Sequence, residues 1–210
     1  MNGNIVQGRI YAGYAKTAQK VGQLYALYRG SPIDPITPGY QLDSIYVAWS
    51  TLTRPFVATA KWSDETWLLW ADGRLLQPRD FLVGPDGTFY VGDMQPNLPI
   101  QAVRCTHVAA TITRPGYTTA DNGTLVANGE VIASNLPMLL KLKSVNVKTT
   151  PGGALTSGVG IGVWLAFLPM AEATLKRNDV ITDTEGVQYE VDAPSWTPMG
   201  YVAQVRLANP

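Results

Sequence analysis

A short unit that occurs twice does most to constrain the fold of this 210-residue chain. Each copy, in segments 79–90 and 178–189, has an acidic residue before an apolar pair, then an acidic residue with glycine, then a tyrosine, and matched positions lie 99 residues apart. Such a pattern between β-type runs is typical of a hairpin turn. We therefore predict one hairpin module used twice. Its turn residues are Asp80, Asp86, Gly87, Asp179, Glu185 and Gly186.

Runs of β-branched and aromatic residues, interrupted by turn residues, surround both units. Predicted strands are 45–49, 56–62, 66–70, 81–83, 88–91, 100–113, 136–147, 164–170, 180–182, 187–191 and 201–207. The expected fold is mainly β with one N-terminal α-helix, and it holds two small β-barrel or β-sandwich modules related as an internal repeat. The predicted domains are a docking helix (1–30), a first β module (31–117) and a second β module (118–210) with a glycine-rich loop at 149–162.

The N-terminal segment carries the one helical pattern. Apolar residues recur at spacings of three, four and seven, which predicts a helix over 4–28. They are Ile10, Tyr14, Val21, Leu24, Tyr25 and Tyr28. Arg29-Gly30 and then Pro32 form a typical stop signal. Because Gly8, Gly13 and Gly22 each weaken a helix by about 1 kcal/mol relative to alanine, this helix needs a docking surface. The surface is either its own domain or a neighbouring subunit.

Charge is sparse and balanced, with 16 Lys and Arg against 16 Asp and Glu, so the chain is not built to coat nucleic acid or an anionic membrane. The first thirty residues are the exception. They carry Arg9, Lys16, Lys20 and Arg29 and no acidic residue. This basic segment is either a solvated helix face or a surface for an acidic partner or for DNA in a channel.

The inventory of chemically active residues is small. One Cys and one His exclude a disulfide framework, a Cys-rich zinc site and a two-His metal site. Cys105 and His107 lie two apart on one predicted strand, which indicates half-buried side chains rather than a nucleophile pair. The carboxylates fall mostly at turns, and the glycine runs match neither phosphate-binding nor dinucleotide-binding patterns. We therefore expect no catalytic, cofactor-binding or metal-binding residues, and no cofactor.

Six tryptophans and ten tyrosines leave a carbohydrate platform as an alternative. Trp67 and Trp70, however, are three apart on a predicted strand and would face opposite ways. Core packing and subunit contacts are the commoner use of such residues. The longest apolar stretch, 159–170, is too short to cross a bilayer and contains Pro169, and the start of the chain lacks the apolar core of a signal peptide. The expectation is a soluble protein made in a cytoplasm.

Several segments resemble a family of tailed-bacteriophage virion proteins encoded among head–tail genes. Residues 10–16 with 20–22 and 28–29 resemble the opening of that family. The run 80–91, followed by 94–96, 98–100, 103–105 and 114–117, resembles its most typical stretch. The tail, 178–181, 189–191 and 200–201, is similar to the last strands of head-closure and neck proteins.

That resemblance implies a structural neck or collar protein of the virion, assembled in the host cytoplasm, that forms a homo-oligomeric ring between head and tail. The implied partners are other copies of the chain, a portal or adaptor protein, and a tail-terminator or tail protein, with packaged DNA nearby and no membrane. The expected contact residues are Arg9, Tyr14, Lys16, Lys20, Leu24, Tyr28 and Arg29. The alternatives are a minor tail or baseplate component, a carbohydrate-binding tail module and, last, an enzyme.

Overall fold

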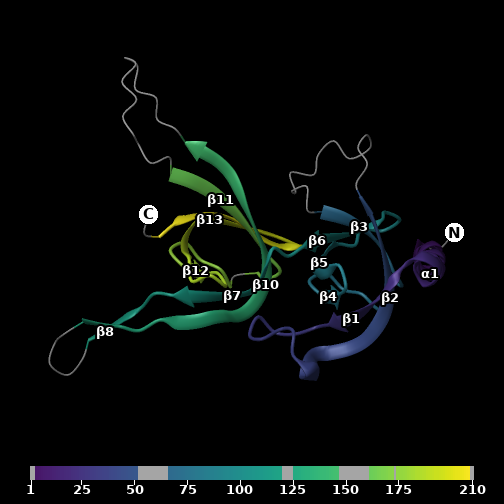
Figure 1. Ribbon diagram of the computed structural model, residues 1–210, viewed down its shortest axis with the longest axis horizontal. Coiled ribbons are helices and arrows are strands. Elements are labelled where there is room, and N and C mark those ends of the chain that lie inside the picture. The colour runs from purple at the N-terminus through teal and green to yellow at the C-terminus, as the bar shows by residue number, and fades with distance from the viewer. Residues whose placement is uncertain (1–2, 52–65, 120–124, 147–160, 173, 209–210) are drawn as a thin grey trace, which may run out of the picture.

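The computed structural model describes residues 3–51, 66–119, 125–146, 161–172 and 174–208. One helix and two β-barrels follow one another along the long axis of the molecule (Figure 1). The predicted fold class, mainly β with one N-terminal helix and two small β modules, is confirmed. The predicted strand 56–62 and nearly all of the predicted loop 149–162 lie outside the described residues.

The first barrel has six antiparallel strands in the order β1-β2-β3-β6-β5-β4, and β4 pairs back onto β1 to close it. The strands are β1 (Gln23–Tyr28), β2 (Gln41–Thr51), β3 (Thr66–Trp70), β4 (Phe81–Gly84), β5 (Gly87–Asp93) and β6 (Ile100–Arg104), with a short 3-10 helix, η1 (Pro38–Tyr40), before β2. Its interior is filled by one apolar cluster that includes Tyr25, Leu27, Leu69, Leu82 and Ile100.

The second barrel has the order β10-β11-β14-β13-β12-β7, and β7 pairs with β10 to close it. The strands are β7 (His107–Arg114), β10 (Glu130–Asn146), β11 (Ile161–Leu168), β12 (Val180–Thr182), β13 (Gln188–Thr197) and β14 (Gly200–Leu207). Between β7 and β10 the chain forms a two-stranded ribbon of β8 (Tyr117–Thr119) and β9 (Leu125–Ala127), which extends away from the barrel (Figure 1).

The repeat extends over the whole barrel, because the two strand orders superimpose in chain order. Strands β1 to β6 correspond to β7, β10, β11, β12, β13 and β14. The pairing registers agree: Trp67 on β3 is opposite Ala102, and Trp164 on β11 is opposite Val205. Equivalent register shifts also follow Val91 in β5 and Val191 in β13. The chain is therefore one barrel architecture used twice.

The constant spacing of 99 residues holds only up to the hairpin turn. Phe81 pairs with Tyr90, whereas the equivalent Val180 pairs with Glu190 rather than Tyr189. The prediction that Tyr90 matches Tyr189 is therefore wrong, and the spacing becomes 100 beyond the turn. The physical reason is one additional turn residue, since Gly84 and Gly87 are paired across the first turn but Thr182 pairs with Gln188 across the second.

The predicted helix over 4–28 is too long. Helix α1 spans Gly3–Val21, and residues Gln23–Tyr28 form strand β1. Tyr25 and Leu27 are two apart, and both are buried inside the first barrel, which is the period of a strand. Gly22 makes the abrupt change possible, since a Cβ there would lie 2.4 Å from Val47 O and 2.6 Å from Ala18 O.

The predicted strand 100–113 is two strands that belong to different barrels. Strand β6 ends at Arg104 and β7 begins at His107, so the chain passes from one barrel to the other through Cys105 and Thr106 alone. Apolar and polar residues alternate through this point because both strands are half-buried. The sequence pattern therefore does not reveal where one barrel ends and the other begins. The predicted module boundary at 117/118 falls after β7, whereas β7 pairs with β10 and β12 of the second barrel.

Candidate functional site

Asp80, one of the predicted turn residues, is an acceptor buried at the start of β4. Its side chain is 1% exposed. Arg29, directly after β1, donates to both carboxylate oxygens over 2.7 Å, and the Gln77 N–H donates over 2.7 Å. The same guanidinium donates to the Leu75 carbonyl over 3.0 Å. Hydrogen bonding to Asp80 raises the pKa of Arg29. This arrangement, here called the first clamp, fixes β4 beside β1.

Asp179 and Arg114 form a second clamp with the same pattern of bonds. Arg114, the last residue of β7, donates to the two Asp179 oxygens over 2.9 and 3.0 Å and to the Thr174 carbonyl over 2.7 Å. The Lys176 N–H donates to Asp179 over 2.7 Å. Hydrogen bonding to Asp179 raises the pKa of Arg114. Asp80 and Asp179 therefore form equivalent bidentate ion pairs with an arginine, one in each barrel.

The remaining predicted turn residues lie at the two hairpin tips. Gly87 and Gly186 have φ of +117° and +82°, a backbone conformation that favours glycine. Asp86 accepts a hydrogen bond from the Tyr25 hydroxyl over 2.8 Å. The Glu185 N–H donates to Asp183 over 2.9 Å. These residues close turns, as the sequence pattern predicts.

Helix α1 packs on the first barrel of its own chain. The Tyr14 ring meets Trp70 edge-on, with centroids 4.8 Å apart, and Ala18 is fully buried. Tyr11 lies over Gly73, where a Cβ would come within 2.5 Å of its ring. Of the two docking surfaces that the sequence leaves open, the chain's own domain is the one the structure shows.

The three basic residues of α1 face away from that contact. At about 100° per residue, Arg9, Lys16 and Lys20 fall within an arc of about 40° on the side opposite Tyr14 and Ala18. All three are exposed, and the helix has no acidic residue. Of the other expected contact residues, Leu24 is exposed on β1, Tyr28 packs against the apolar cluster that includes Phe81, and Arg29 belongs to the first clamp.

Cys105 and His107 do not form an activated nucleophile. Cys105 is buried in the connection between the barrels, and burial raises the pKa of its thiol, which disfavours the thiolate. His107 Nδ1 lies 2.9 Å from Thr106 Oγ1, and its Nε2 lies 3.9 Å from Asp183. Within the described ranges, no three His, Cys, Asp or Glu side chains gather to hold a metal ion.

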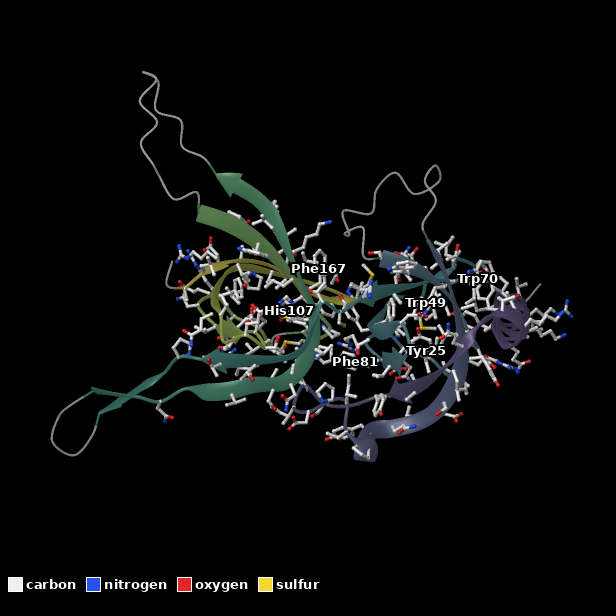
Figure 2. The ribbon with its side chains drawn as sticks, in the orientation of Figure 1. Tyr25, Trp49, Trp70, Phe81, His107 and Phe167 are labelled. Carbon is white, nitrogen blue, oxygen red and sulfur yellow. The ribbon has the colours of Figure 1, made fainter. Side chains whose placement is uncertain are left out.

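The described tryptophans mostly serve packing. Trp49 stacks on Phe89 with centroids 4.0 Å apart, and its indole donates to the Tyr25 hydroxyl (Figure 2). Trp70 lies under α1, while Trp164 meets Tyr189 edge-on. Trp62 lies outside the described residues. Trp67 packs against the apolar cluster inside the first barrel, whereas Trp70 contacts α1 on the outside, so the two side chains do not share a face.

A cavity of about 230 Å³ lies where the two barrels meet. It is lined by Arg29 and Asp80 of the first clamp, by Phe81, and by Leu136 and Pro169 of the second barrel. Arg29 and Asp80 are bonded to each other there, and Arg79 is the third charged residue of the lining. None of the helices in the described part of the chain is long and apolar enough to cross a membrane.

Sequence reasoning missed both the arginine partners and the contact between the barrels. A weak signal for the arginines exists, since Arg29-Gly30 and Arg114-Pro115 each end a strand at equivalent places. The contact surface of Phe81, Tyr90 and Val103 carries no separate signal, because buried residues on the inner and outer faces of a strand look alike in sequence.

No family model, curated protein or solved structure matches this chain.

Proposed function

We propose that this chain is a structural protein of a tailed-phage virion, a ring-forming neck or collar subunit between the portal-bearing head and the tail. One observation supports it most: two copies of one closed barrel are fused in one chain, and each copy is fastened by an equivalent buried aspartate–arginine clamp. A rigid tandem barrel is suited to hold neighbours at fixed positions. The resemblance of segments 10–16, 80–91 and 178–181 to neck proteins supplies the place in the particle.

The mechanism is mechanical. Because both barrels are closed, neither has an edge strand, and we expect the subunit to make its contacts through barrel side chains and through projecting segments such as the two-stranded β8–β9 ribbon. The partners are other copies of the chain, a portal or adaptor protein on the head side and a tail protein on the other. The basic stripe of Arg9, Lys16 and Lys20 on α1 is available to an acidic neighbour or to DNA in the channel.

Copy number in purified particles tests the proposal. Quantitative mass spectrometry against the major capsid protein is expected to give about six or twelve copies, because a closed ring fixes a small number of subunits. Hundreds of copies would place the chain along the tail or on the capsid surface. Absence from the particle would overturn the proposal.

A further inference from the structure

Strand β2 extends beyond the strand that pairs with it on one side. Its stretch 41–47 pairs with β1, whereas β3 pairs only with residues 48–51. Strand β10 of the second barrel has the same overhang, because β7 pairs with the stretch 130–138 and β11 begins its pairing at Leu139. Among the described strands, each overhang therefore has one partner strand and one open side. Backbone groups on such a side can pair with an added segment.

A segment of the first barrel lies along the open side of β10. Ile33 pairs with Ser134 in parallel. The Ser134 N–H donates to the Pro32 carbonyl over 3.2 Å, and the Ser134 carbonyl accepts from the Asp34 N–H over 2.9 Å. The Asn135 side chain also donates to the Asp34 carboxylate. Residues 32–34, here called the strap, therefore bind β10 as a short added strand does.

The place on β2 that matches the strap site is an open groove. By register, Ile45 of β2 matches Leu136 of β10. Ser44 therefore stands at the position of Ser134, where β10 has one additional residue. Ser134 is half-buried beside the strap, whereas Ser44 is exposed. A groove of about 170 Å³ runs between the stretch 43–46 of β2, helix α1 and the turn after β3. Figure 1 shows α1 beside β2.

The backbone at Ser44 is hydrogen-bonded locally. Within the described part of the chain, no second segment pairs with β2 at Ser44 on its open side. The Ser44 N–H instead donates to the carboxylate of its neighbour Asp43 over 2.7 Å. That N–H is the counterpart of the one that Ser134 donates to the strap. An entering segment can replace the carboxylate with its own backbone carbonyl at little cost, because one acceptor is exchanged for another.

Asp43 also sets the charge of the groove. It is exposed, and none of the ion pairs between described residues includes it. Asp72, the other acid of the lining, is paired with Arg74. On the strap, the side chain at this place is Asp34, which meets the amide of Asn135. A segment that fits β2 therefore carries Lys or Arg where the strap carries an acid.

The remaining wall of the groove suits an apolar side chain. In the strap site, Pro32 and Leu136 line one cavity. Ile45, the counterpart of Leu136, lines the groove beside β2 together with Ala15 and Leu75. An apolar residue two positions before the basic one meets this wall, just as Pro32 lies two positions before the acid of the strap.

We propose that the groove beside β2 binds an extended segment of a partner protein, in which an apolar residue lies two positions before a lysine or arginine. The segment adds to β2 at Ser44 as the strap adds to β10 at Ser134. Backbone hydrogen bonds supply the affinity, and the Asp43 carboxylate selects the basic residue. The groove lies within one chain, so binding there does not require the ring of the proposed function.

A peptide titration of the full-length, ¹⁵N-labelled protein tests the groove by NMR. The probe is the hexapeptide Ser-Pro-Ile-Lys-Pro-Ile, which is the sequence of residues 31–36 with lysine in place of Asp34. It is expected to shift the Ser44 amide signal with a dissociation constant of about 1 mM or below. The matched peptide with aspartate in place of lysine is expected to bind at least about threefold more weakly. Shifts confined to Ser134, or no shift up to about 10 mM peptide, would overturn the proposal.

A methyl group on the backbone nitrogen of the peptide lysine separates strand addition from attraction between charges. This nitrogen corresponds to the Asp34 N–H that donates to Ser134, and methylation removes the hydrogen while the charge stays the same. The methylated peptide is therefore expected not to bind. Equal binding of the two lysine peptides would show that the segment does not pair with β2.

Variants of the protein supply the second measurement. Ala15→Phe fills the groove and is expected to weaken binding of the lysine peptide at least about tenfold. Ala12→Phe is the matched control, because Ala12 is also half-buried on α1 and lies outside the lining. Asp43→Asn is expected to bring the two peptides within about twofold of each other. Circular dichroism establishes that each variant is folded, and a folded Ala15→Phe protein with normal binding would refute the groove.

The outcomes for the groove and for the neck assignment can be told apart. Failure of the peptide to bind a chain that is present in about six or twelve copies per particle would refute the groove alone. Peptide binding at Ser44 by a protein that is absent from particles would refute the neck assignment alone.

Discussion

The first clamp joins the end of β1 to the start of β4, and the second joins the end of β7 to the start of β12. Because Asp80 and Asp179 are each 1% exposed and accept three hydrogen bonds, their loss leaves donors without acceptors. We expect Asp80→Ala and Asp179→Ala each to lower the free energy of unfolding by about 3 kcal/mol, as seen when one partner of a buried ion pair is removed. Urea denaturation monitored by tryptophan fluorescence measures this loss.

Asp93 serves as the comparison for the clamps. It accepts a bond from Gln95 at an exposed site, so Asp93→Ala is expected to change stability by less than about 0.5 kcal/mol. If Asp80→Ala lowered the free energy of unfolding no more than Asp93→Ala does, the clamp would not hold β4 in place.

The Tyr90 hydroxyl is an unusual group at the barrel junction. It is fully buried, and no hydrogen-bond partner reaches it among the described residues. Removing an unsatisfied buried hydroxyl is nearly neutral or stabilising. We therefore expect Tyr90→Phe to retain or increase the melting temperature, while Tyr90→Ala lowers it by removing the ring from the apolar cluster. A calorimetric scan that showed Tyr90→Phe to be strongly destabilising would reveal a partner for the hydroxyl.

At the scale of the element, α1 has few buried residues and carries several glycines. Among the described apolar residues of the helix, only Ala18 is fully buried. The helix also contains Gly8 and Gly13, and there is open space around both. Gly13→Ala is expected to stabilise the helix by up to about 1 kcal/mol, because alanine loses less backbone entropy. Slower amide exchange of α1 against an unchanged barrel is the expected result.

Replacing Gly22 with alanine is expected to have the opposite effect on the helix. A Cβ there would meet two backbone oxygens closer than 3 Å, and backbone cannot move aside cheaply. Gly22→Ala is therefore expected to weaken the docking of α1 and to speed amide exchange along the helix. An exchange pattern like that of Gly13→Ala would mean that the helix–strand junction adjusts freely.

Sequence reasoning identified elements whose signal is local. The strands 66–70 and 180–182 match the structure to the residue, and the hairpin 81–91 lies where its turn chemistry predicts. The errors came where tertiary packing decides. Tyr25 and Leu27 fit a helical stripe equally well until the barrel interior selects the strand, and the change of barrel at Cys105–Thr106 has no turn residue to mark it. Arg29 and Arg114 reach acids far along the chain, which no local pattern contains.

At the scale of the whole molecule, the barrel junction sets a response to alkali. Burial raises the pKa of both Cys105 and Tyr90 above their ordinary values of 9.0 and 10.0. The folded protein therefore keeps protons that the unfolded chain releases. The free energy of unfolding should be unaffected by these groups below about pH 9 and should fall as the pH rises further. Denaturation midpoints measured from pH 7 to 11 test this.

A double variant assigns the effect to these two groups. Cys105→Ala with Tyr90→Phe should flatten the decline of stability with pH, since neither replacement ionises. Tyr14→Phe, which removes a more exposed tyrosine with a raised pKa, should change the slope less. An unchanged slope in the double variant would place the alkaline sensitivity elsewhere.

The order of strands along the chain also governs synthesis. All six strands of the first barrel precede Cys105, so that barrel is complete while the second still awaits translation. Phe81, Tyr90 and Val103 then remain uncovered until β10 and β11 arrive, and the second barrel closes only with β14, about 100 residues after β6. At roughly 5–20 residues per second, that interval lasts about 5–20 seconds. During this interval the apolar surface of Phe81, Tyr90 and Val103 is exposed on the nascent chain. We therefore expect ribosome-associated chaperones to bind the unfinished protein, and slower elongation after Arg104 to increase its aggregation.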